Sequence, residues 1–395
     1  MENNACEVTI LMPCLNEAET LETCIKKAGA FLEDNEVVGE ILIADNGSTD
    51  GSQEIAAKAG AKVIHVETKG YGSALISGCE AAKGKYVIMG DSDDSYDFYN
   101  LMPFLDQLRG GYDLVMGNRF AGGIEEGAMP WLHRYIGNPV LSFVGRLFFN
   151  SHITDFHCGL RGYNRESIMR LNLKTTGMEY ASEMVVMSEL NHLKITEVPT
   201  ILQKDGRSGR PHLQSFRDGW RHLKFLFMYA PNWLFLYPGV VLLAIGFIGS
   251  VSLILGQIAI SQVVFSVHTL LYCMFFVMIG FNIITLFWCV KLYAYNHQFI
   301  PRQNSIDWNK KLNEDAFIFG GFLMAALGIA LSVYAFGYWR HSGYSELQPE
   351  VVMRITIPAA SLLEMGIQAV FAGFMIGIFK IKIRNDVEEK SGQNS

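Results

Sequence analysis

Short apolar runs alternate with longer stretches of helical spacing over the first 120 residues of the chain. The apolar runs have the length of buried strands and lie at Val8–Met12, Glu40–Ala44, Lys62–Val66, Tyr86–Met89 and Asp113–Met116. The first four are each followed by a polar turn and then by a stretch whose apolar residues recur at helical spacing. Strands that alternate with helices predict an α/β fold, in which helices cover both faces of a mostly parallel sheet.

Polar residues collect directly after these runs, at Glu17, Asp45, Asp91, Asp93 and Arg119. The carboxyl ends of parallel strands meet at one edge of a sheet, and open α/β sheets bind their ligands there. Asp91 and Asp93 flank a single residue, and hard oxygen ligands at this spacing suit Mg²⁺ or Mn²⁺ that holds a diphosphate. The alternative is an acidic turn that caps a helix starting near Tyr99, because Asp and Ser favour such caps.

A dinucleotide-binding Rossmann domain fits these turns poorly. The first turn between strand and helix reads Pro13-Cys14-Leu15-Asn16-Glu17, where a Rossmann domain has Gly-x-Gly-x-x-Gly. Gly70 and Gly72 follow only the third strand, and two glycines alone are weak evidence. An NAD or FAD enzyme is therefore disfavoured, and the acidic edge still predicts a metal ion that holds a diphosphate.

Five motifs in order along the chain resemble family-2 glycosyltransferases, which have the GT-A fold. They are Pro13-x-x-Asn16-Glu17, Asp45-x-Gly47-Ser48-x-Asp50-Gly51, Asp91-x-Asp93, Met116-Gly117-Asn118-Arg119-Phe120 and Asp155-Phe156-His157-Cys158-Gly159-Leu160-Arg161. The last two are similar to segments of the dolichyl-phosphate mannose and glucose synthases. The resemblance covers roughly residues 7–230.

The resemblance implies roles for individual residues. Asp45 would contact the nucleotide base, and Asp91 and Asp93 would hold the metal and act in catalysis together with Arg119. The other residues of the nucleotide-sugar site would be Pro13, Asn16, Glu17, Gly47, Ser48 and Gly70. Leu15 replaces the usual Tyr, and Asp94-Ser95 replaces the Gln often found after Asp-x-Asp, so the sugar and the base of the donor stay open.

The second half of the chain has a different composition. Half of all 395 residues are hydrophobic and only 18% are charged, and the excess lies after Pro231. Four stretches without Lys, Arg or Asp lie at Trp233–Leu255, Thr269–Val290, Ala316–Phe336 and Ile355–Phe379. About 20 apolar residues span a bilayer, so we predict four transmembrane helices within residues 232–380 and a tail at 381–395.

The distribution of charge and the cysteines predict the side of the membrane on which the catalytic domain lies. Basic residues concentrate in the connection between the second and third stretches and in the tail, and Gly256–His268 has none. The positive-inside rule then puts both termini and residues 1–213, the catalytic domain, on the cytoplasmic side of the cell membrane. The acidic start lacks the apolar core of a signal peptide, and seven scattered cysteines agree with a reducing compartment. A net charge of −7 argues against nucleic acid as a partner.

Residues 214–231 read as an amphipathic helix between the two domains. Phe216, Trp220, Leu223 and Phe227 share one face, while Arg217, Arg221 and Lys224 share another. Such a helix lies in the headgroup layer, which would bring the acidic edge close to lipid head groups. The alternative is a helix that docks on the catalytic domain.

The resemblance implies a polyprenyl (undecaprenyl or dolichyl) phosphate as acceptor, and this arrangement would allow a lipid head group to reach the acidic edge. The phosphate oxygen of such an acceptor is already anionic, so catalysis would rest on positioning and on charge stabilisation. The candidate phosphate ligands are Arg119, Arg134, Arg207 and Arg210, because Arg binds phosphate through two parallel hydrogen bonds. Surface salt bridges are the alternative role for each.

Three functions remain open at this stage. The leading prediction is an inverting hexosyltransferase that moves sugar from a UDP- or GDP-sugar to the lipid phosphate. A processive polysaccharide synthase would also join this domain to membrane helices, but Asp218 follows Gln214-Ser215-Phe216-Arg217 where Trp is expected. A non-catalytic glycolipid carrier is the third, and whether the protein is a homo-oligomer is open.

Three further features have simpler explanations. We expect His157-Cys158 to be structural, because two adjacent residues cannot make a tetrahedral metal site alone. Glu179 and Glu183, four apart, would share a helix face, and we expect a solvated face, with a general base and its partner as the alternative. Glu364 lies inside the fourth apolar stretch, where an ionisable group is costly, and either a pairing with Asn282 or His268 or a role in a lipid path is open.

Overall fold

The computed structural model describes residues 6–208, 215–297, 299, 307–345 and 348–381. The chain divides into two compact units, Met1–Tyr229 and Ala230–Ser395. Each unit is described by itself.

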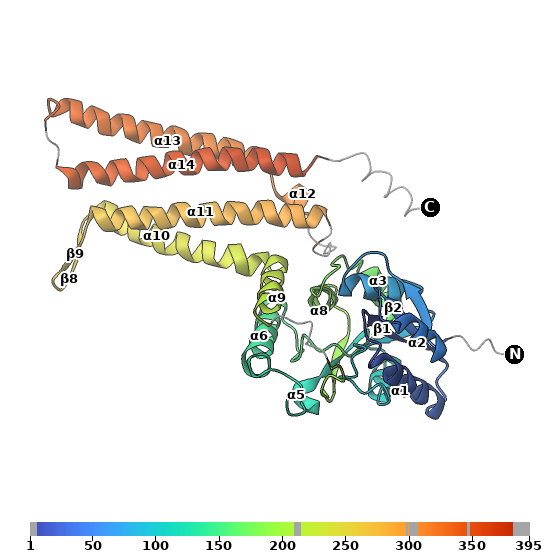
Figure 1. The fold of residues 1–395 in the computed structure, drawn as a ribbon. Helices are drawn as coiled ribbons and strands as arrows, with labels where there is room; N and C mark the ends of the chain where they lie inside the picture. The colour runs from blue at the N-terminus through green and yellow to red at the C-terminus, as the bar shows by residue number, and fades with distance from the viewer. Residues whose placement is uncertain (1–5, 209–214, 298, 300–306, 346–347, 382–395) are drawn as a thin grey trace. The chain divides into compact units, whose positions relative to one another are not determined.

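A seven-stranded sheet forms the centre of the first unit (Figure 1). Its strands are β1 (Val8–Cys14), β2 (Gly39–Asp45), β3 (Lys62–His65), β4 (Tyr86–Met89), β5 (Leu114–Asn118), β6 (Arg161–Asn164) and β7 (Ile195–Pro199). Their order is β3-β2-β1-β4-β6-β5-β7. Neighbouring strands are parallel except where β6 pairs with β4 and β5. The predicted α/β fold with a mostly parallel sheet is confirmed, and the antiparallel β6 was not anticipated.

Helices cover both faces of this sheet. They are α1 (Leu21–Asp34), α2 (Ser52–Lys58), α3 (Tyr71–Ala81), α4 (Met102–Arg109), α5 (Arg119–Gly122), α6 (Asn138–Phe149), which continues a π-helical turn at His133–Gly137, α7 (Arg165–Arg170), α8 (Tyr180–Leu190) and α9 (Ser215–Tyr229). Alternate residues of β1 serve the two cores, because successive side chains of a strand point to opposite faces. Ile10 and Met12 pack with α1 and α4, and Leu11 packs with α3, α7 and α8.

One predicted helix start was wrong by three residues. The helix expected near Tyr99 begins at Met102, because the carboxylate of Asp97 accepts the Tyr99 N–H (3.1 Å) in a turn that precedes it. The predicted turn at residues 13–17 is a loop bonded to the turn after β2, and α1 follows it at Leu21.

Helices α6 and α9 pack against each other in this unit (Figure 1). Phe225 and Leu226 of α9 are buried with Leu141 of α6 and Val186 of α8, and the Phe227 ring lies 5.0 Å from that of Phe148. Much of the apolar surface of α9 is thus used for docking. The exposed apolar residues of this pair are mostly on α6 and the turn before it: Trp131, Leu132, Tyr135, Ile136, Val140, Phe143 and Leu147, with Trp220 and Met228 on α9. We call these nine residues the α6–α9 apolar surface.

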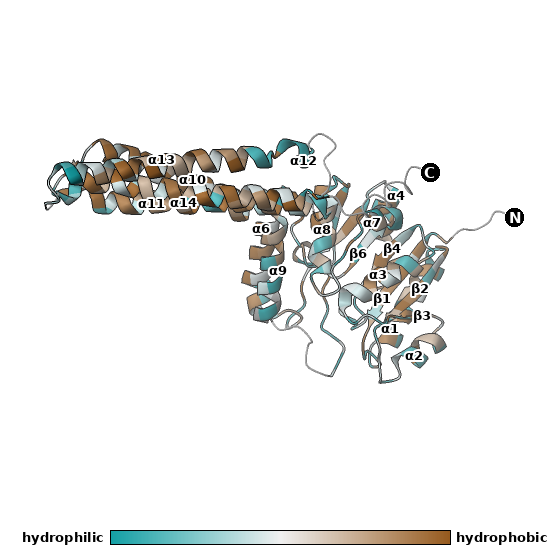
Figure 2. Ribbon diagram, turned by 90° about the horizontal axis from the view of Figure 1, so that it is seen from above, coloured by the Kyte–Doolittle hydropathy of each residue, from teal (hydrophilic) through white to brown (hydrophobic). Residues whose placement is uncertain are grey.

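Four apolar helices account for most of the second unit, and each is long enough to cross a membrane. They are α10 (Tyr237–Leu255), preceded by a π-helical turn at Asn232–Leu236, α11 (Val267–Asn296), α13 (Glu314–His341) and α14 (Pro349–Phe379), and Figure 2 shows their predominantly hydrophobic colouring. A short hairpin of β8 (Ile258–Ile260) and β9 (Val263–Phe265) joins the first two, and α12 (Trp308–Lys311) precedes α13. The prediction of four transmembrane helices is confirmed, and the last three are longer than their apolar stretches.

Glu364 in α14 forms a hydrogen bond with a polar residue on another helix. Its Oε1 accepts a hydrogen bond from Nδ2 of Asn282 in α11 at 3.2 Å. Of the two partners that the sequence suggested, Asn282 is the one to which this carboxyl is bonded.

Candidate active site

Asp91 lies just past the end of β4, deep in the edge of the sheet. The Tyr71 hydroxyl donates to its Oδ1 at 3.0 Å. Its Oδ2 faces Gly159, where an added Cβ would lie only 2.3 Å away, so the carboxylate is seated against bare backbone. Burial and the nearby charge of Asp93 raise the pKa of Asp91 to about 6, although Tyr71 and Arg161 oppose the rise. A carboxyl group with such a raised pKa releases its proton when a metal cation binds to it.

Asp93 divides its two oxygens between two partners. Oδ1 accepts from the backbone N–H and the hydroxyl of Ser95, at 3.1 and 2.6 Å. Oδ2 accepts from Nη2 of Arg207 at 3.3 Å. The next residue, Asp94, instead pairs with Lys27 of α1 at 2.8 Å. The acidic run therefore separates into the Asp91–Asp93 pair and one carboxylate that anchors the loop to a helix.

Arg207 is surrounded by carboxylates from three segments. Its Nη1 lies 2.8 Å from Oε1 of Glu17, and its Nε lies 2.9 Å from Oδ1 of Asp205, in addition to the contact with Asp93. The second oxygen of Glu17 is buried and has no hydrogen-bond partner among the described residues. Burial raises the pKa of Glu17 to about 7, with Arg207 opposing and Asp93 adding to the rise.

The predicted nucleotide-sugar residues come together in two interlocked loops. The loop after β1 is bonded to the loop after β2 through Asn16, whose N–H donates to the Ser48 hydroxyl (2.9 Å) and whose side-chain oxygen accepts from Thr49 N–H (2.8 Å). Asn16 holds a positive φ of 60°, which Asn tolerates better than most residues. The Ser92 hydroxyl donates to the carbonyl of Pro13 at 2.8 Å and so connects these loops to the Asp91–Asp93 segment.

Asp45 lies at the base of the second loop and is fully buried. It accepts hydrogen bonds from the N–H groups of Gly47 (3.0 Å) and Ser48 (3.1 Å) and from Gln53 (2.6 Å). Burial raises its pKa, but these hydrogen bonds outweigh burial and hold the pKa below its ordinary value. Gly70 joins the same region, because its N–H donates to the side chain of Asn46 at 2.7 Å.

The predicted arginines have different environments. Arg119 is buried and makes a two-pronged salt bridge to Asp155, with Nε–Oδ2 and Nη2–Oδ1 distances of 2.7 Å each. Arg134 lies in the turn before α6, where its guanidinium is 5.6 Å from the Tyr135 ring, and it makes no ion pair within the described part of the chain. Arg207 faces the carboxylates, and Arg210 lies outside the described residues.

Arg161 is the last residue of the motif that begins at Asp155, and the sequence predicted no role for it. Its side chain is completely buried and donates to the backbone carbonyls of Cys158 (2.8 Å), Phe156 (3.1 Å) and Ala181 (2.5 Å). Its charge is one of the influences that lower the pKa of Asp91. The position of Arg161 at the end of a motif was the only hint in the sequence that it lies near the site. The burial of its side chain could not be predicted from the sequence.

Comparison with known proteins shows the family of the chain. Residues 9–171 match glycosyl transferase family 2, and residues 288–380 match the glycosyltransferase family 2 C-terminal transmembrane region. The low-salt glycan biosynthesis hexosyltransferase Agl6 of Haloferax volcanii is 34% identical over 94% of this chain and 88% of its own length. The chain belongs to glycosyltransferase family 2.

Other relatives are more distant from this glycosyltransferase. The dolichyl-phosphate hexose transferase of Haloferax volcanii is 29% identical over 54% of this chain and 89% of its own length. Glucosyl-3-phosphoglycerate synthase from Mycobacterium tuberculosis, crystallised with Mn²⁺, UDP and glucosyl-3-phosphoglycerate, shares 21% identity over 56% of this chain and 79% of its own, with a TM-score of 0.46.

The described part of the glycosyltransferase contains no cluster of three or more Asp, Glu, His or Cys residues arranged as metal ligands. Asp91 and Asp93 would therefore supply at most two protein ligands. Mg²⁺ is commonly held by one or two carboxylates, with water and substrate phosphates completing its shell. The carboxylate oxygens of Asp91 and Asp93 are hard donors that suit such an ion. Asp93 already contacts a positive group, the guanidinium of Arg207.

The prediction that Glu179 and Glu183 form a solvated face was wrong. Glu183 is buried and accepts from the N–H of Thr175 (2.8 Å), the Thr175 hydroxyl (2.6 Å) and the Tyr229 hydroxyl (3.2 Å). Glu179 pairs with Arg221 of α9 at 2.7 Å. Glu183 is bonded to the loop before α8 and to Tyr229 of α9, and Glu179 is paired with Arg221 of α9. The two carboxylates therefore stabilise the positions of this loop and of α9.

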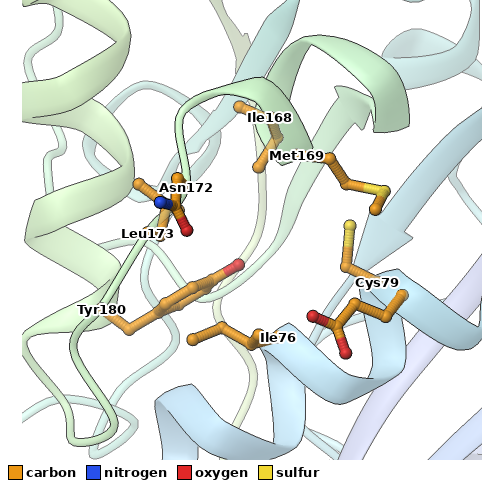
Figure 3. Close-up of a pocket in the computed structure, with 8 residues that line it drawn as sticks. Ile76, Cys79, Ile168, Met169, Asn172, Leu173 and Tyr180 are labelled. Carbon is orange, nitrogen blue, oxygen red and sulfur yellow. The ribbon is translucent and has the colours of Figure 1, made fainter. Parts of the chain in front are cut away.

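A separate pocket of about 80 Å³ lies between α3, α7 and the start of α8 (Figure 3). It is lined by Ile76, Cys79, Glu80, Ile168, Met169, Asn172, Leu173 and Tyr180. None of the predicted site residues lines it, and its walls are mainly apolar. Its chemistry does not match that of a nucleotide-sugar site.

Proposed function

We propose that this membrane glycosyltransferase transfers a hexose from a nucleotide sugar to polyprenyl phosphate at the cytoplasmic surface. The observation that carries the proposal is the Asp91–Asp93 pair past β4 with Arg207 beside it, 3.3 Å from Asp93. A nucleoside diphosphate requires charge neutralisation, which a divalent cation can supply, and an acceptor phosphate requires a cationic partner, for which arginine is well suited. Both requirements meet at one edge of the sheet.

The names of relatives support this substrate class. Agl6 is described as a hexosyltransferase, and a second relative is described as a dolichyl-phosphate hexose transferase. Similarity over 88% of the length of Agl6 includes the membrane helices, which suits an acceptor that is itself a lipid.

On the donor side, Asp91 and Asp93 would hold Mg²⁺ or Mn²⁺. When bound, this ion would neutralise charge on the departing nucleoside diphosphate. Pro13, Asn16, Glu17, Gly47, Ser48 and Gly70 belong to loops that are already bonded to one another, and these loops would receive the nucleotide. Asp45 would face the base while its other contacts hold the loop.

On the acceptor side, the lipid phosphate brings its own negative oxygen, so the protein needs no general base for it. That oxygen forms a bond to the anomeric carbon while the bond from this carbon to the diphosphate breaks, which inverts the configuration. Arg207 and Arg134 are the proposed phosphate ligands, and Arg119 keeps further N–H donors after its bonds to Asp155. Arg210 belongs to the same proposal, although it lies outside the described residues.

The α6–α9 apolar surface supports an acceptor that arrives from the bilayer. Trp131 and Phe143 expose 66% and 56% of their surfaces, and Arg134 and Arg146 lie among these apolar residues. Apolar and basic side chains together are typical of helices in the headgroup layer. The positive-inside rule applied to the connections between the membrane helices supports a cytoplasmic position for this unit and for both termini.

The test is a product assay with the full-length protein in lipid nanodiscs. Labelled UDP- and GDP-hexoses are supplied with Mg²⁺ or Mn²⁺ and undecaprenyl or dolichyl phosphate, and the lipid fraction is separated by thin-layer chromatography. We expect one labelled lipid carrying a single sugar. A long polymer would favour a processive synthase, and no lipid product with any donor would refute the proposal.

A further inference from the structure

The guanidinium of Arg207 is held where cations are expected to bind. It donates to Glu17, Asp93 and Asp205, and only 16% of its side chain is exposed. Asp205 and Arg207 are close in sequence, whereas Glu17 and Asp93 come from the loops after β1 and β4. A single positive charge therefore contacts three carboxylates, and one of them, Asp93, belongs to the proposed metal site.

The division of oxygens on Asp93 makes this contact competitive. Oδ1 is already bonded to Ser95 through both the backbone N–H and the hydroxyl. Oδ2 is the oxygen left for a metal ion, and Oδ2 is the one that Arg207 contacts. A divalent cation and a guanidinium repel each other, so the two cannot share this oxygen at low cost.

The backbone around Arg207 is fixed independently of its side chain. The Gly206 N–H donates to the carbonyl of Asp93 and the Gln203 N–H donates to that of Ser95, each at 2.9 Å. The N–H and hydroxyl of Ser208 both donate to Glu19 at 2.7 Å. The guanidinium can therefore leave the carboxylates by side-chain rotation while the loop stays attached.

We propose that Arg207 is an exchangeable counter-ion, which a divalent metal bound by Asp91 and Asp93 displaces from Asp93 and Glu17. In metal-free protein Arg207 neutralises part of the negative charge at the acidic edge. Metal binding releases the guanidinium next to the reacting groups, where it can bind a phosphate. For the identity of that phosphate the inference rests on the proposed function, and it implies that the metal-bound donor binds before the acceptor.

The first experiment measures Mn²⁺ affinity without nucleotide, sugar or lipid acceptor, by the loss of the free Mn²⁺ signal in electron paramagnetic resonance. In Arg207→Gln the ion no longer competes with charge-assisted hydrogen bonds, and we expect binding about ten- to a hundredfold tighter than in wild type. The matched control is Arg109→Gln, which breaks the Arg109–Glu7 pair (2.8 Å) at a distant position and should leave Mn²⁺ affinity unchanged. Equal or weaker binding by Arg207→Gln would overturn the exchange.

The second experiment uses wild-type protein and reads the position of the guanidinium directly. Phenylglyoxal modifies free guanidinium groups, and peptide mass spectrometry reports the extent at each arginine. Mn²⁺ should increase modification of Arg207 several-fold and leave Arg109 unchanged, and Asp93→Ala should abolish the increase. Unchanged or reduced modification of Arg207 with Mn²⁺ would contradict the proposal.

These readouts separate the inference from the proposed function. Neither involves sugar transfer, so a failed lipid assay with both results positive would leave the exchange standing and remove the acceptor assignment. A lipid product with both results negative would keep the function and make Arg207 a fixed partner of the carboxylates.

Discussion

The salt bridge between Arg119 and Asp155 allows a structural role and a phosphate-binding role to be separated. Both side chains are buried, and Asp155 also accepts the backbone N–H of Arg119 at 3.0 Å. Removing one partner leaves the other charge buried and unpaired, which costs about 3–5 kcal/mol. Replacing both by apolar residues of similar size removes the two charges together and costs far less.

We therefore expect Arg119→Met and Asp155→Leu to destabilise the first unit strongly and the double variant to recover most of the loss. For a domain of this size about 1 kcal/mol corresponds to 2–4 °C, so each single change should lower the apparent unfolding temperature by roughly 6–20 °C. The measurement is thermal unfolding of the full chain in one detergent. Double-variant coupling of more than about 1 kcal/mol would be the signature of the pair.

Transfer activity of the double variant then decides the role of Arg119. If Arg119 binds the acceptor, the double variant is stable yet needs much more polyprenyl phosphate, with unchanged nucleotide affinity. If stability and transfer recover together, Arg119 is only a partner of Asp155. An unfolding temperature in Arg119→Met equal to that of wild type would refute the reasoning about the buried pair altogether.

Three further predictions concern the metal, pH and membrane orientation. Asp93→Ala should abolish metal-dependent transfer while far-ultraviolet circular dichroism stays unchanged, and full activity of this variant, or of wild type in EDTA, would exclude the metal assignment. Burial raises the pKa of Glu17 to about 7, so the protonated form favours folding, and this contribution is lost as the pH rises through about 7. Metal-free wild type should thus unfold at lower temperature at about pH 8 than at about pH 5, and Glu17→Gln should lose less, whereas equal slopes would contradict the assignment. In a cysteine-free background, a cysteine at Ser261 should react with a membrane-impermeant reagent from outside and one at Ser305 only after permeabilisation, and the reverse pattern would refute the cytoplasmic placement.

The sequence was most informative where local pattern determines structure. Five strands were placed within two residues of their bounds, because each is a short apolar run followed by a polar turn. Asp91 and Asp93 were assigned to the end of a strand for the same reason. The four apolar helices followed from length and composition alone.

Contacts between distant segments could not be predicted. Asp155 lies 36 residues after Arg119, and nothing in either segment specifies the other as its partner. Arg207 lies 190 residues from Glu17 and 114 from Asp93, so its position among carboxylates depends on the completed fold. Glu183 was misassigned because helical spacing alone does not reveal which face the neighbouring loop covers.

The bonding between the loops after β1 and β2 has a consequence for changing donor preference by mutation. The polar side-chain atoms of Asn16, Ser48 and Asp50 are already used to hold the neighbouring loop. A substitution chosen to suit a different base would also loosen the opposite loop and spend binding free energy on reordering it. Single changes should therefore weaken every donor before they favour a new one. Exchanging both loops as a matched set from a relative is the more promising route to altered selectivity.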